Sequence, residues 1–383
     1  MARVLVAATG GAGGDLQPLV AVALALRARG HETRFLGDAS VGRALGPLGV
    51  DVDVLPPDLD LGPRLARAVR EAMEASRGDL AAAGPAVQKG LELWAHDMVE
   101  PVKRAATEQA PDVIVTSLFG VEALHLAAPS QPWAVINSTF YVGSPLQRPA
   151  EQDFGPRAIP LLTRYASLLD SADLILHASD QVFDFDFKGL PDKHHYAGPL
   201  GIWEPPGPVP SYLDEPGPRW ALVTISSQLQ DDIPLAQVAL AALADRSVRV
   251  LLTVGPDHDP AELSNVPSNA RIERTVSHAA VLEHGALFLS HAGHGSVMKA
   301  LWNGCPMVLV PWGRDQPGVA ARAAALGIAE VVERDVATPE ALGAAIDRVS
   351  ASEEMRIIAT RHSERLRATD PPATAASLIE SLV

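Results

Sequence analysis

Two histidines, two serines and an Asp-Gln pair occur within residues 287–327, beside two predicted helix starts. At the first start a buried strand leads into a glycine-containing loop, and Ser296 is predicted to cap a helix that ends at Gly304. Free N–H groups and the positive dipole end make such a loop suitable for phosphate. His291 and His294 lie in this loop and can donate hydrogen bonds to phosphate oxygens. A tight strand-to-helix turn with surface histidines is the alternative interpretation.

The second helix start contains the Asp-Gln pair. Asp315 suits the N-cap position and Pro317 the first turn of the helix. A carboxylate beside an amide can also accept from and donate to vicinal hydroxyl groups, so Asp315 and Gln316 are candidates for binding a sugar. A phosphate loop followed by a hydroxyl-binding turn indicates that the two helix starts hold two parts of one sugar nucleotide.

The elements that must position these residues alternate between strand and helix. Residues 3–8, RVLVAA, form an apolar run typical of a strand buried on both faces. A glycine-rich turn, a helix ending at Gly30 and a second strand follow, which is a βαβ unit. The Pro- and Gly-rich stretch 198–220 predicts a linker, after which the pattern starts again at residues 220–227. We therefore expect two Rossmann-like domains that face each other across a cleft.

Composition narrows the class of function. The chain has 383 residues, of which 47% are hydrophobic and 20% charged, as expected of two globular domains. Its net charge of −15 argues against binding to nucleic acid or to an anionic membrane. A single cysteine, Cys305, excludes an internal disulfide and a Cys-rich metal site. The apolar runs are too short for a secretory signal or a membrane span, so we expect a cytoplasmic protein without integral membrane association.

These motifs together resemble one known family. HAGHGS (residues 291–296), GCPMVLVPWGRDQP (304–317) and TVSHAAVL (275–282) are similar to the donor-binding signature of nucleotide-sugar-dependent glycosyltransferases with the GT-B fold. The similarity is greatest to the family 1-like bacterial group that glycosylates antibiotics and other natural products. It implies an acceptor-binding domain, a linker, a donor-binding domain and a C-terminal helix that returns to the first domain, at residues 1–203, 204–217, 218–364 and 365–383.

The resemblance also implies residue roles in the donor site. His291 is expected to contact the phosphates, and Asp315 and Gln316 to hold sugar hydroxyls, without a metal or cofactor. Many relatives have a ribose-binding Glu where this chain has Lys299, and a Lys there either reaches phosphate or is solvated. The complete set of expected donor-binding residues is Ser226, Ser227, Val276, His291, Gly293, Gly295, Ser296, Asp315 and Gln316.

The acceptor side offers a candidate base. Asp15 stands in a Gly-Asp-x-x-Pro pattern at the position where many relatives carry a His, and inverting transfer needs a group that takes the acceptor's proton. The alternative is that Asp15 only caps the first helix, which would lower the pKa of its carboxyl group. Asn137 and Ser138, at the end of a predicted strand, and Trp94, on a helix, are the candidate acceptor contacts.

The sequence therefore predicts an inverting, metal-independent glycosyltransferase. Its donor is expected to be a dTDP- or UDP-sugar, with dTDP favoured, and its acceptor a hydrophobic natural-product aglycone, glycosylated on oxygen or carbon. An NAD-dependent oxidoreductase is disfavoured because Leu16 occupies the third glycine position of the G-x-G-x-x-G pattern. A nucleotide-sugar epimerase of the same fold and a non-catalytic helper remain open, as does a homodimer.

Overall fold

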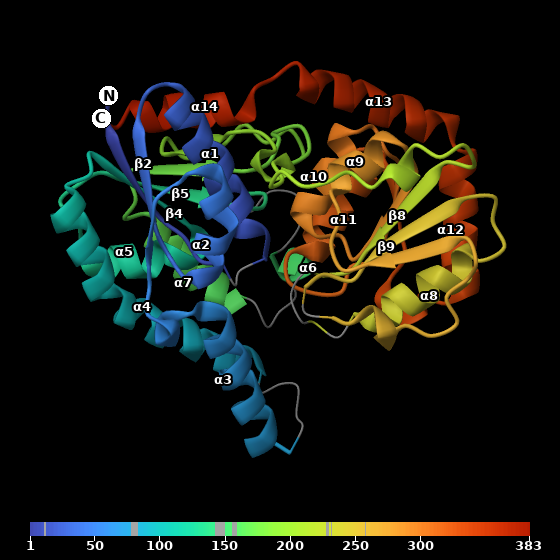
Figure 1. The fold of residues 1–383 in the computed structure, drawn as a ribbon, viewed down its shortest axis with the longest axis horizontal. Helices are drawn as coiled ribbons and strands as arrows, with labels where there is room; N and C mark the ends of the chain where they lie inside the picture. Colours follow the sequence, from blue (N-terminus) through green and yellow to red (C-terminus); the bar gives the residue numbers. More distant parts are fainter. Residues whose placement is uncertain are drawn as a thin grey trace.

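A computed structural model describes residues 1–10, 13–77, 83–141, 150–226, 230, 232–256 and 258–383, except for residues 155–158. The chain forms two α/β domains, each built on a parallel sheet with helices on both faces (Figure 1). In both sheets the first strand stands in the middle, flanked on one side by the next two strands and on the other by the later ones. This is the strand order of doubly wound nucleotide-binding domains, and it confirms the two predicted Rossmann-like domains.

The sheet of the first domain has the order β3-β2-β1-β4-β5-β6-β7. Its strands are β1 (Arg3–Ala7), β2 (Glu32–Gly37), β3 (Val52–Val54), β4 (Val113–Ser117), β5 (Trp133–Asn137), β6 (Leu174–His177) and β7 (His194–Tyr196). The helices of this domain are α1 (Leu16–Ala28), α2 (Ala39–Leu45), α3 (Leu61–Ala75), α4 (Ala83–Gln109), α5 (Val121–Ala127), α6 (Ala150–Phe154) and α7 (Ile159–Leu169).

The sheet of the second domain has the order β10-β9-β8-β11-β12-β13. Its strands are β8 (Trp220–Thr224), β9 (Arg249–Thr253), β10 (Ala270–Glu273), β11 (Gly285–Ser290), β12 (Met307–Leu309) and β13 (Ala329–Val331). The helices are α8 (Ile233–Leu243), α9 (His278–Glu283), α10 (His294–Trp302), α11 (Gln316–Ala325), α12 (Pro339–Ala351) and α13 (Glu353–Arg367), and α14 (Pro371–Glu380) ends the chain.

The apolar runs form strands because both faces of each sheet are covered. In β1, Val4 and Val6 join the core cluster that includes α1, whereas Leu5, which points to the other face, joins the cluster that includes α4. Side chains of a strand alternate between the two faces, so a continuous apolar sequence is what a sheet with two covered faces requires.

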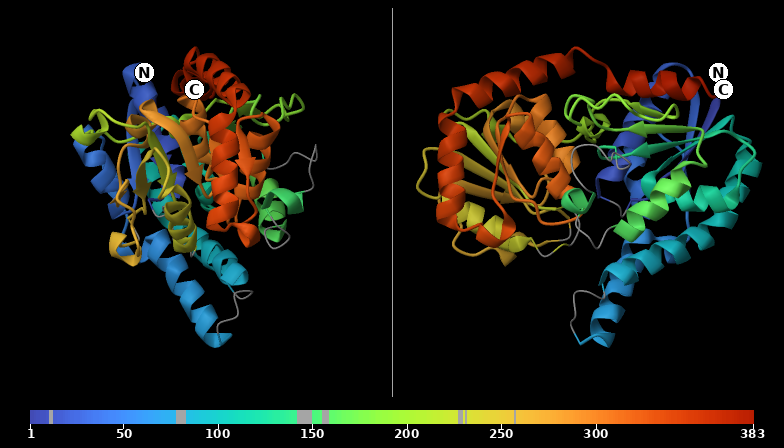
Figure 2. Two further views of the ribbon diagram at one scale, coloured as in Figure 1. Left: turned by 90° about the vertical axis from the view of Figure 1, so that its right-hand side faces the viewer. Right: turned by 180° about the vertical axis from the view of Figure 1, so that it is seen from behind.

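The C-terminal helices connect the two domains. Helix α13 runs along the second domain, and α14 crosses to the first, where it packs on α1 (Figure 2). Ala375, Ala376 and Ile379 of α14 belong to the core cluster of the first domain, and Glu380 pairs with Arg29. This packing gives the first domain part of its core from the far end of the chain.

Helices α3 and α4 pack against each other, and α3 projects from the body of the first domain (Figure 1). Within the described part of the chain, no helix combines the length and apolar character needed to cross a membrane.

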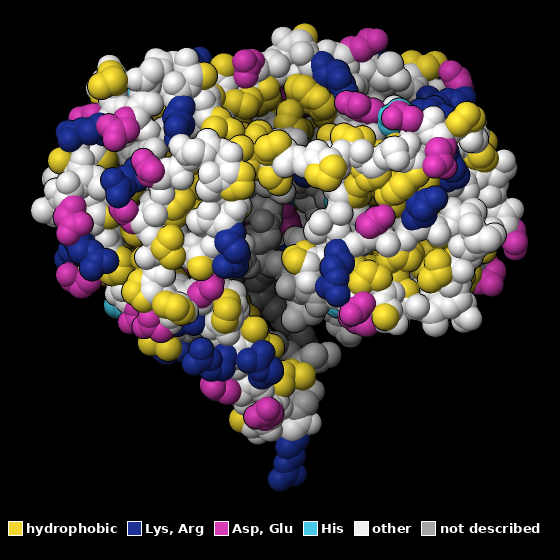
Figure 3. All heavy atoms as spheres, in the orientation of Figure 1, with side chains coloured by type: hydrophobic (Ala, Val, Ile, Leu, Met, Phe, Trp, Pro, Cys, Tyr) yellow, Lys and Arg dark blue, Asp and Glu magenta, His cyan; other side chains and the backbone are white. Residues whose placement is uncertain are grey.

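The space-filling view shows the surface hollowed between the two domains (Figure 3). In parallel sheets the carboxyl ends of the strands are the usual position of ligand sites, and the turns after these ends contain the residues discussed next.

Candidate active site

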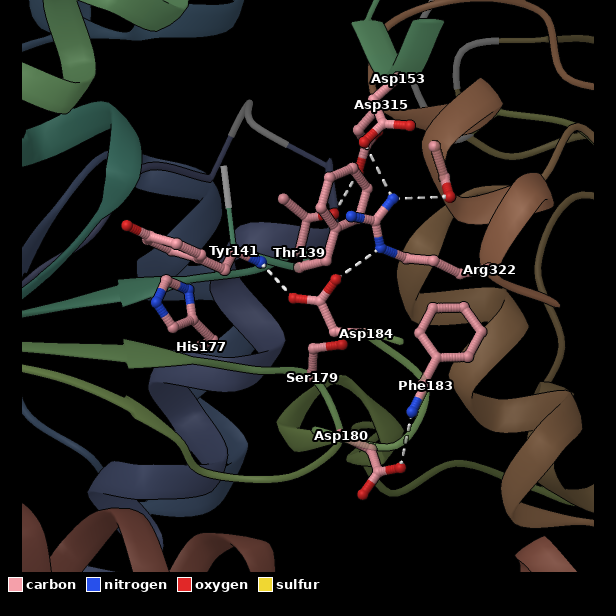
Figure 4. Close-up of polar contacts among 12 residues, drawn as sticks. Thr139, Tyr141, Asp153, His177, Ser179, Asp180, Phe183, Asp184, Asp315 and Arg322 are labelled. Atoms are coloured by element: carbon pink, nitrogen blue, oxygen red, sulfur yellow. Dashed lines mark hydrogen bonds and ion pairs between the residues drawn. The ribbon is translucent and has the colours of Figure 1, made fainter. Parts of the chain in front are cut away.

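The two domains meet through residues that follow the carboxyl ends of their strands. Thr139, which follows β5 of the first domain, donates a hydrogen bond of 2.6 Å from its hydroxyl to Asp315 Oδ2 at the start of α11 (Figure 4). His294, the first residue of α10, lies 3.1 Å through Nε2 from the Ser179 hydroxyl, which follows β6. The candidate site is thus made from both domains.

Asp15, the candidate base, immediately precedes α1 and is only 4% exposed. Its carboxyl group makes no capping hydrogen bond to the helix; instead, Oδ1 accepts a hydrogen bond from the Ser138 hydroxyl, and Oδ2 has no partner among the described residues. Burial raises the pKa of Asp15 to about 7; the Ser138 hydrogen bond opposes this shift, nearby Asp315 adds to it and Arg314 opposes it. The side-chain geometry and the raised pKa contradict the capping alternative, which required bonds to backbone N–H groups and a lowered pKa.

The glycine loop before α10 has the form expected of an anion site, with one difference. The helix begins at His294 and its N-cap is Gly293, so Ser296 lies in the first turn and the prediction that it caps the helix is wrong. A Cβ atom at Gly293 would lie 2.7 Å from His291 Nε2, so a side chain there would collide with the imidazole ring. A Cβ atom at Gly295 would meet nothing within 4 Å, which leaves the backbone open to a ligand.

The two histidines of this loop differ in position. His291 is buried, with Nδ1 3.4 Å from the Thr224 carbonyl oxygen, and burial lowers the pKa of its imidazole. Its Nε2 faces Gly293 and hence the N-terminus of α10. His294 was predicted to donate to phosphate, but its ring contacts Ser179 of the other domain and burial lowers its pKa to about 4. We therefore correct its role to an interdomain contact.

The Asp-Gln pair lies at the start of α11 as predicted, but Asp315 makes no capping hydrogen bond, because its carboxylate is turned to Thr139. The Gln316 side chain is occupied. Its Oε1 accepts from the backbone N–H groups of Trp312 (2.8 Å) and Gly313 (3.0 Å), and its Nε2 donates to Gln230 at 3.0 Å. Gln316 thus shapes the turn before α11, whereas the Asp315 carboxylate faces the opposite domain.

The turn after β8 contains Asp232, a residue that the sequence interpretation missed. Ser226 is buried, and its backbone N–H donates to Asp232 Oδ2 at 2.7 Å. Asp232 is fully buried and also accepts from Gln230, so it organises the turn that faces His291. Its position in the run QLQDD, just before a predicted helix, was the available signal. Ser227 lies outside the described residues.

Arg314 was also missed. It precedes Asp315 with a positive φ of 57°, and its charge acts on Asp15, Asp232 and Asp315. The residue keeps contact with solvent, although burial lowers the pKa of its guanidinium group, and it places a cation beside these carboxylates.

Val276, expected near the nucleotide base, is half-buried against the core of the second domain just before α9. The nearby Lys299 is neither solvated nor directed to phosphate. It is buried and forms an ion pair of 2.9 Å with Glu204 from the interdomain segment. The other oxygen of Glu204 accepts from the Ser277 hydroxyl at 2.7 Å. Glu204 thus joins Lys299 to the start of α9.

The acceptor candidates separate into three cases. Ser138 contacts the candidate base. Asn137 is buried, and its amide donates to the Phe140 carbonyl at 2.8 Å, so it holds the turn after β5 instead of facing an acceptor. Trp94 is 2% exposed in the core of the first domain, with its indole N–H donating to the Leu59 carbonyl at 2.8 Å. Its predicted acceptor contact is therefore corrected to a packing role.

Among the described residues, His, Cys, Asp and Glu side chains do not gather in threes as metal ligands.

Comparison with known proteins gives similarities over both domains. Residues 237–382 match the family "Erythromycin biosynthesis protein CIII-like, C-terminal domain", and residues 5–45 match the "Glycosyltransferase family 28 N-terminal domain". The chain is 28% identical over 223 residues to 4'-demethylrebeccamycin synthase of Lentzea aerocolonigenes, and 25% identical over 271 residues to demethyllactenocin mycarosyltransferase of Streptomyces fradiae. These matches cover 57% and 67% of this chain, but only 52% and 57% of the relatives.

A solved structure resembles the whole fold. The spinosyn rhamnosyltransferase SpnG, complexed with thymidine diphosphate, has a TM-score of 0.72 and 20% sequence identity, with 99% of each chain covered.

Proposed function

We propose that this chain, which belongs to the bacterial natural-product glycosyltransferases of the GT-B fold, transfers a sugar or deoxysugar from a nucleoside-diphosphate sugar to a hydrophobic aglycone. The reaction inverts the anomeric centre, needs no metal and forms a bond to an acceptor oxygen or carbon. The observation that supports it best is Asp15, a buried carboxyl group with a pKa of about 7 and one oxygen that has no partner among the described residues. It lies close enough to Asp315, at the start of α11, for the charge of that carboxylate to raise its pKa.

The proposed reaction is a single displacement. The acceptor atom attacks the anomeric carbon while the bond from that carbon to the diphosphate oxygen breaks, and the acceptor's proton passes to Asp15 Oδ2. A base is most effective when its pKa lies near the working pH, as that of Asp15 does. The Ser138 hydroxyl holds the other carboxylate oxygen and so orients the base.

The charge on the departing diphosphate needs a local partner. The backbone N–H groups at the N-terminus of α10 and the imidazole of His291 supply hydrogen-bond donors, and Arg314 supplies a positive charge. Asp315 is placed to accept hydrogen bonds from sugar hydroxyls in exchange for its bond to Thr139. These groups together can replace the charge compensation that a metal ion would otherwise provide.

The donor we propose is dTDP-linked, with UDP as the competing nucleotide. The thymidine diphosphate held by the spinosyn rhamnosyltransferase supports dTDP. A thermal-shift screen with dTDP, UDP, GDP and NAD tests the donor class. A selective rise in Tm with dTDP is expected, whereas a rise with NAD alone would contradict the proposal.

Turnover needs its own test, because a non-catalytic helper would also bind the nucleotide. Purified protein is incubated with dTDP-sugars and a panel of hydrophobic phenols and macrolactones, and dTDP release and glycosylated product are followed by mass spectrometry. Product formation that is lost in Asp15→Asn supports the enzyme. Strong dTDP binding without turnover on any acceptor would favour the helper.

A further inference from the structure

A cluster of buried charges joins the two domains away from the reacting groups. Arg322, on α11 of the second domain, is 3% exposed. Its Nε donates to Asp184 Oδ1 at 2.7 Å and its Nη1 to Asp153 Oδ2 at 3.0 Å, and both carboxylates belong to the first domain (Figure 4). The guanidinium carbon lies 3.5 Å from the centroid of the Phe140 ring. One planar side chain therefore binds two carboxylates and an aromatic ring of the opposite domain.

The same face of α11 carries the proposed sugar-binding carboxylate. Asp315 and Arg322 are seven residues apart, which is two helical turns, so they lie on one side of the helix. Gly318 lies between them, and a Cβ atom there would be only 2.6 Å from the Phe140 ring, so the helix packs closely against the first domain at this point. Fixing Arg322 therefore also fixes the direction in which the Asp315 end of α11 points.

The cluster reaches the proposed base through the backbone. Asp184 also accepts hydrogen bonds from the Tyr141 backbone N–H at 3.0 Å and from the Tyr196 hydroxyl at 2.7 Å. Tyr141 belongs to the same segment as Ser138 and Thr139, which bind Asp15 and Asp315, respectively. A movement of Asp184 would therefore shift the segment that touches both the base and the sugar-binding carboxylate.

We propose that Arg322, with Asp184 and Asp153, is a positioning cluster that sets the base on the first domain against the sugar-binding helix of the second. This role rests on the proposed function, because it presumes that Asp15 and Asp315 act on acceptor and donor. Arg322 touches neither substrate. A guanidinium can hold two carboxylates in a fixed plane, whereas the ammonium of a lysine acts as a single point charge.

The test is Arg322→Lys, which retains the positive charge but loses the planar guanidinium that binds both carboxylates and stacks on Phe140. Arg348→Lys is the matched control, because Arg348 forms an exposed ion pair with Glu330 on the surface of the second domain. We expect kcat to fall about 10- to 100-fold in Arg322→Lys, in line with the cost of a small misplacement of reacting groups. The Kd for dTDP should stay within about twofold, because the cluster does not touch the groups proposed to bind the diphosphate.

Hydrogen–deuterium exchange gives a readout that does not depend on turnover. The peptide containing residues 137–141 should exchange faster in Arg322→Lys than in the wild type or Arg348→Lys, because the Tyr141 N–H loses its fixed acceptor. If the wild type transfers no sugar, the proposed function fails, but this comparison still tests the cluster. Unchanged exchange would overturn the proposal, as would an unchanged kcat or a kcat loss accompanied by an equal loss of dTDP affinity. If Arg322→Lys does not fold, Asp153→Asn, which retains the Asp184 pair, replaces it with a fall in kcat as the expected result; an unchanged kcat would overturn the proposal.

Discussion

The charge state of Asp15 should make the protein less stable as pH rises, and Asp15→Asn should remove this effect. Folding raises the pKa of Asp15 from 3.8 to about 7, mainly through burial. The folded state therefore keeps a proton that the unfolded chain has already lost, so stability falls as pH rises through this window and levels off above pH 7. A shift of about 3 units corresponds to roughly 4 kcal/mol, taken as an order of magnitude.

The measurement is chemical denaturation of wild type and Asp15→Asn at about pH 5.5 and about pH 8.5. Roughly half of the effect, about 2 kcal/mol, falls between these two values because the folded group ionises near pH 7. Asn cannot ionise and still offers an oxygen to Ser138, so the variant should gain stability relative to the wild type at the higher pH. Its kcat should fall by about 10²- to 10⁴-fold, the usual effect of losing a general base.

Asp38→Asn is the control for this experiment. Burial of Asp38 is outweighed by hydrogen bonds from Ser40 and from the backbone N–H groups of Gly10 and Val41, so the pKa of its carboxyl group is lowered. A lowered pKa contributes stability that is present throughout the range from pH 5.5 to 8.5, so this variant should lose stability similarly at both values. If Asp15→Asn behaved in the same way and retained turnover, Asp15 would be a structural residue and the proposed base would be refuted.

Three further outcomes are expected at the site. Gly295→Ala should leave Tm unchanged because its Cβ meets no neighbour, yet weaken dTDP binding in calorimetry; equal affinity would place the diphosphate elsewhere. If the lowered pKa of His291 leaves its ring neutral, and the one ring proton is on Nδ1 and donated to the Thr224 carbonyl oxygen, then Nε2 carries no proton. Nε2 must therefore gain a proton before it can donate a hydrogen bond to phosphate. dTDP binding near pH 7 should then take up a proton, seen as a binding enthalpy that varies with buffer. Arg314 lowers the pKa of Asp15 in the free protein. If bound diphosphate draws Arg314 away, this pKa should rise in the substrate complex, so the acid limb of the pH profile of kcat should lie at higher pH than that of kcat/KM; the reverse order would contradict this.

The fold could be predicted because its signals are local. Apolar runs such as residues 3–8 and 220–224 can form only buried strands when helices alternate with them, and the prolines of the stretch 198–220 exclude a continuous element. The chain topology then follows from the right-handed crossovers of parallel strands. The exact helix starts were less certain, and Ser296 was assigned to the cap that Gly293 provides, since both residues are compatible with a helix N-terminus.

Only part of the site could be predicted, because some of its residues are continuous in sequence whereas others contact partners from distant segments. The glycine loop and the Asp-Gln turn are continuous in sequence, so residue types alone indicated their place. The partners of Lys299 and Arg322 come from segments about 95 to 170 residues away, and no local pattern specifies which carboxylate a buried cation will meet. The prediction that Trp94 contacts the acceptor failed for a related reason, because a helical tryptophan gives the same sequence pattern whether it lines a pocket or fills a core.

The role of Asp15 shows why a motif could not distinguish base from cap. Both roles place an Asp directly before a helix, and the difference lies in where the carboxyl group turns. Here Ser138, more than a hundred residues later in the chain, accounts for one oxygen, and the other is buried without a partner in the part of the chain that the structure describes. Asp315 from the second domain adds to the rise in pKa. The basicity of Asp15 is therefore a property of the two domains in contact, and it follows that groups which hold the domains together, such as Arg322, also govern the base.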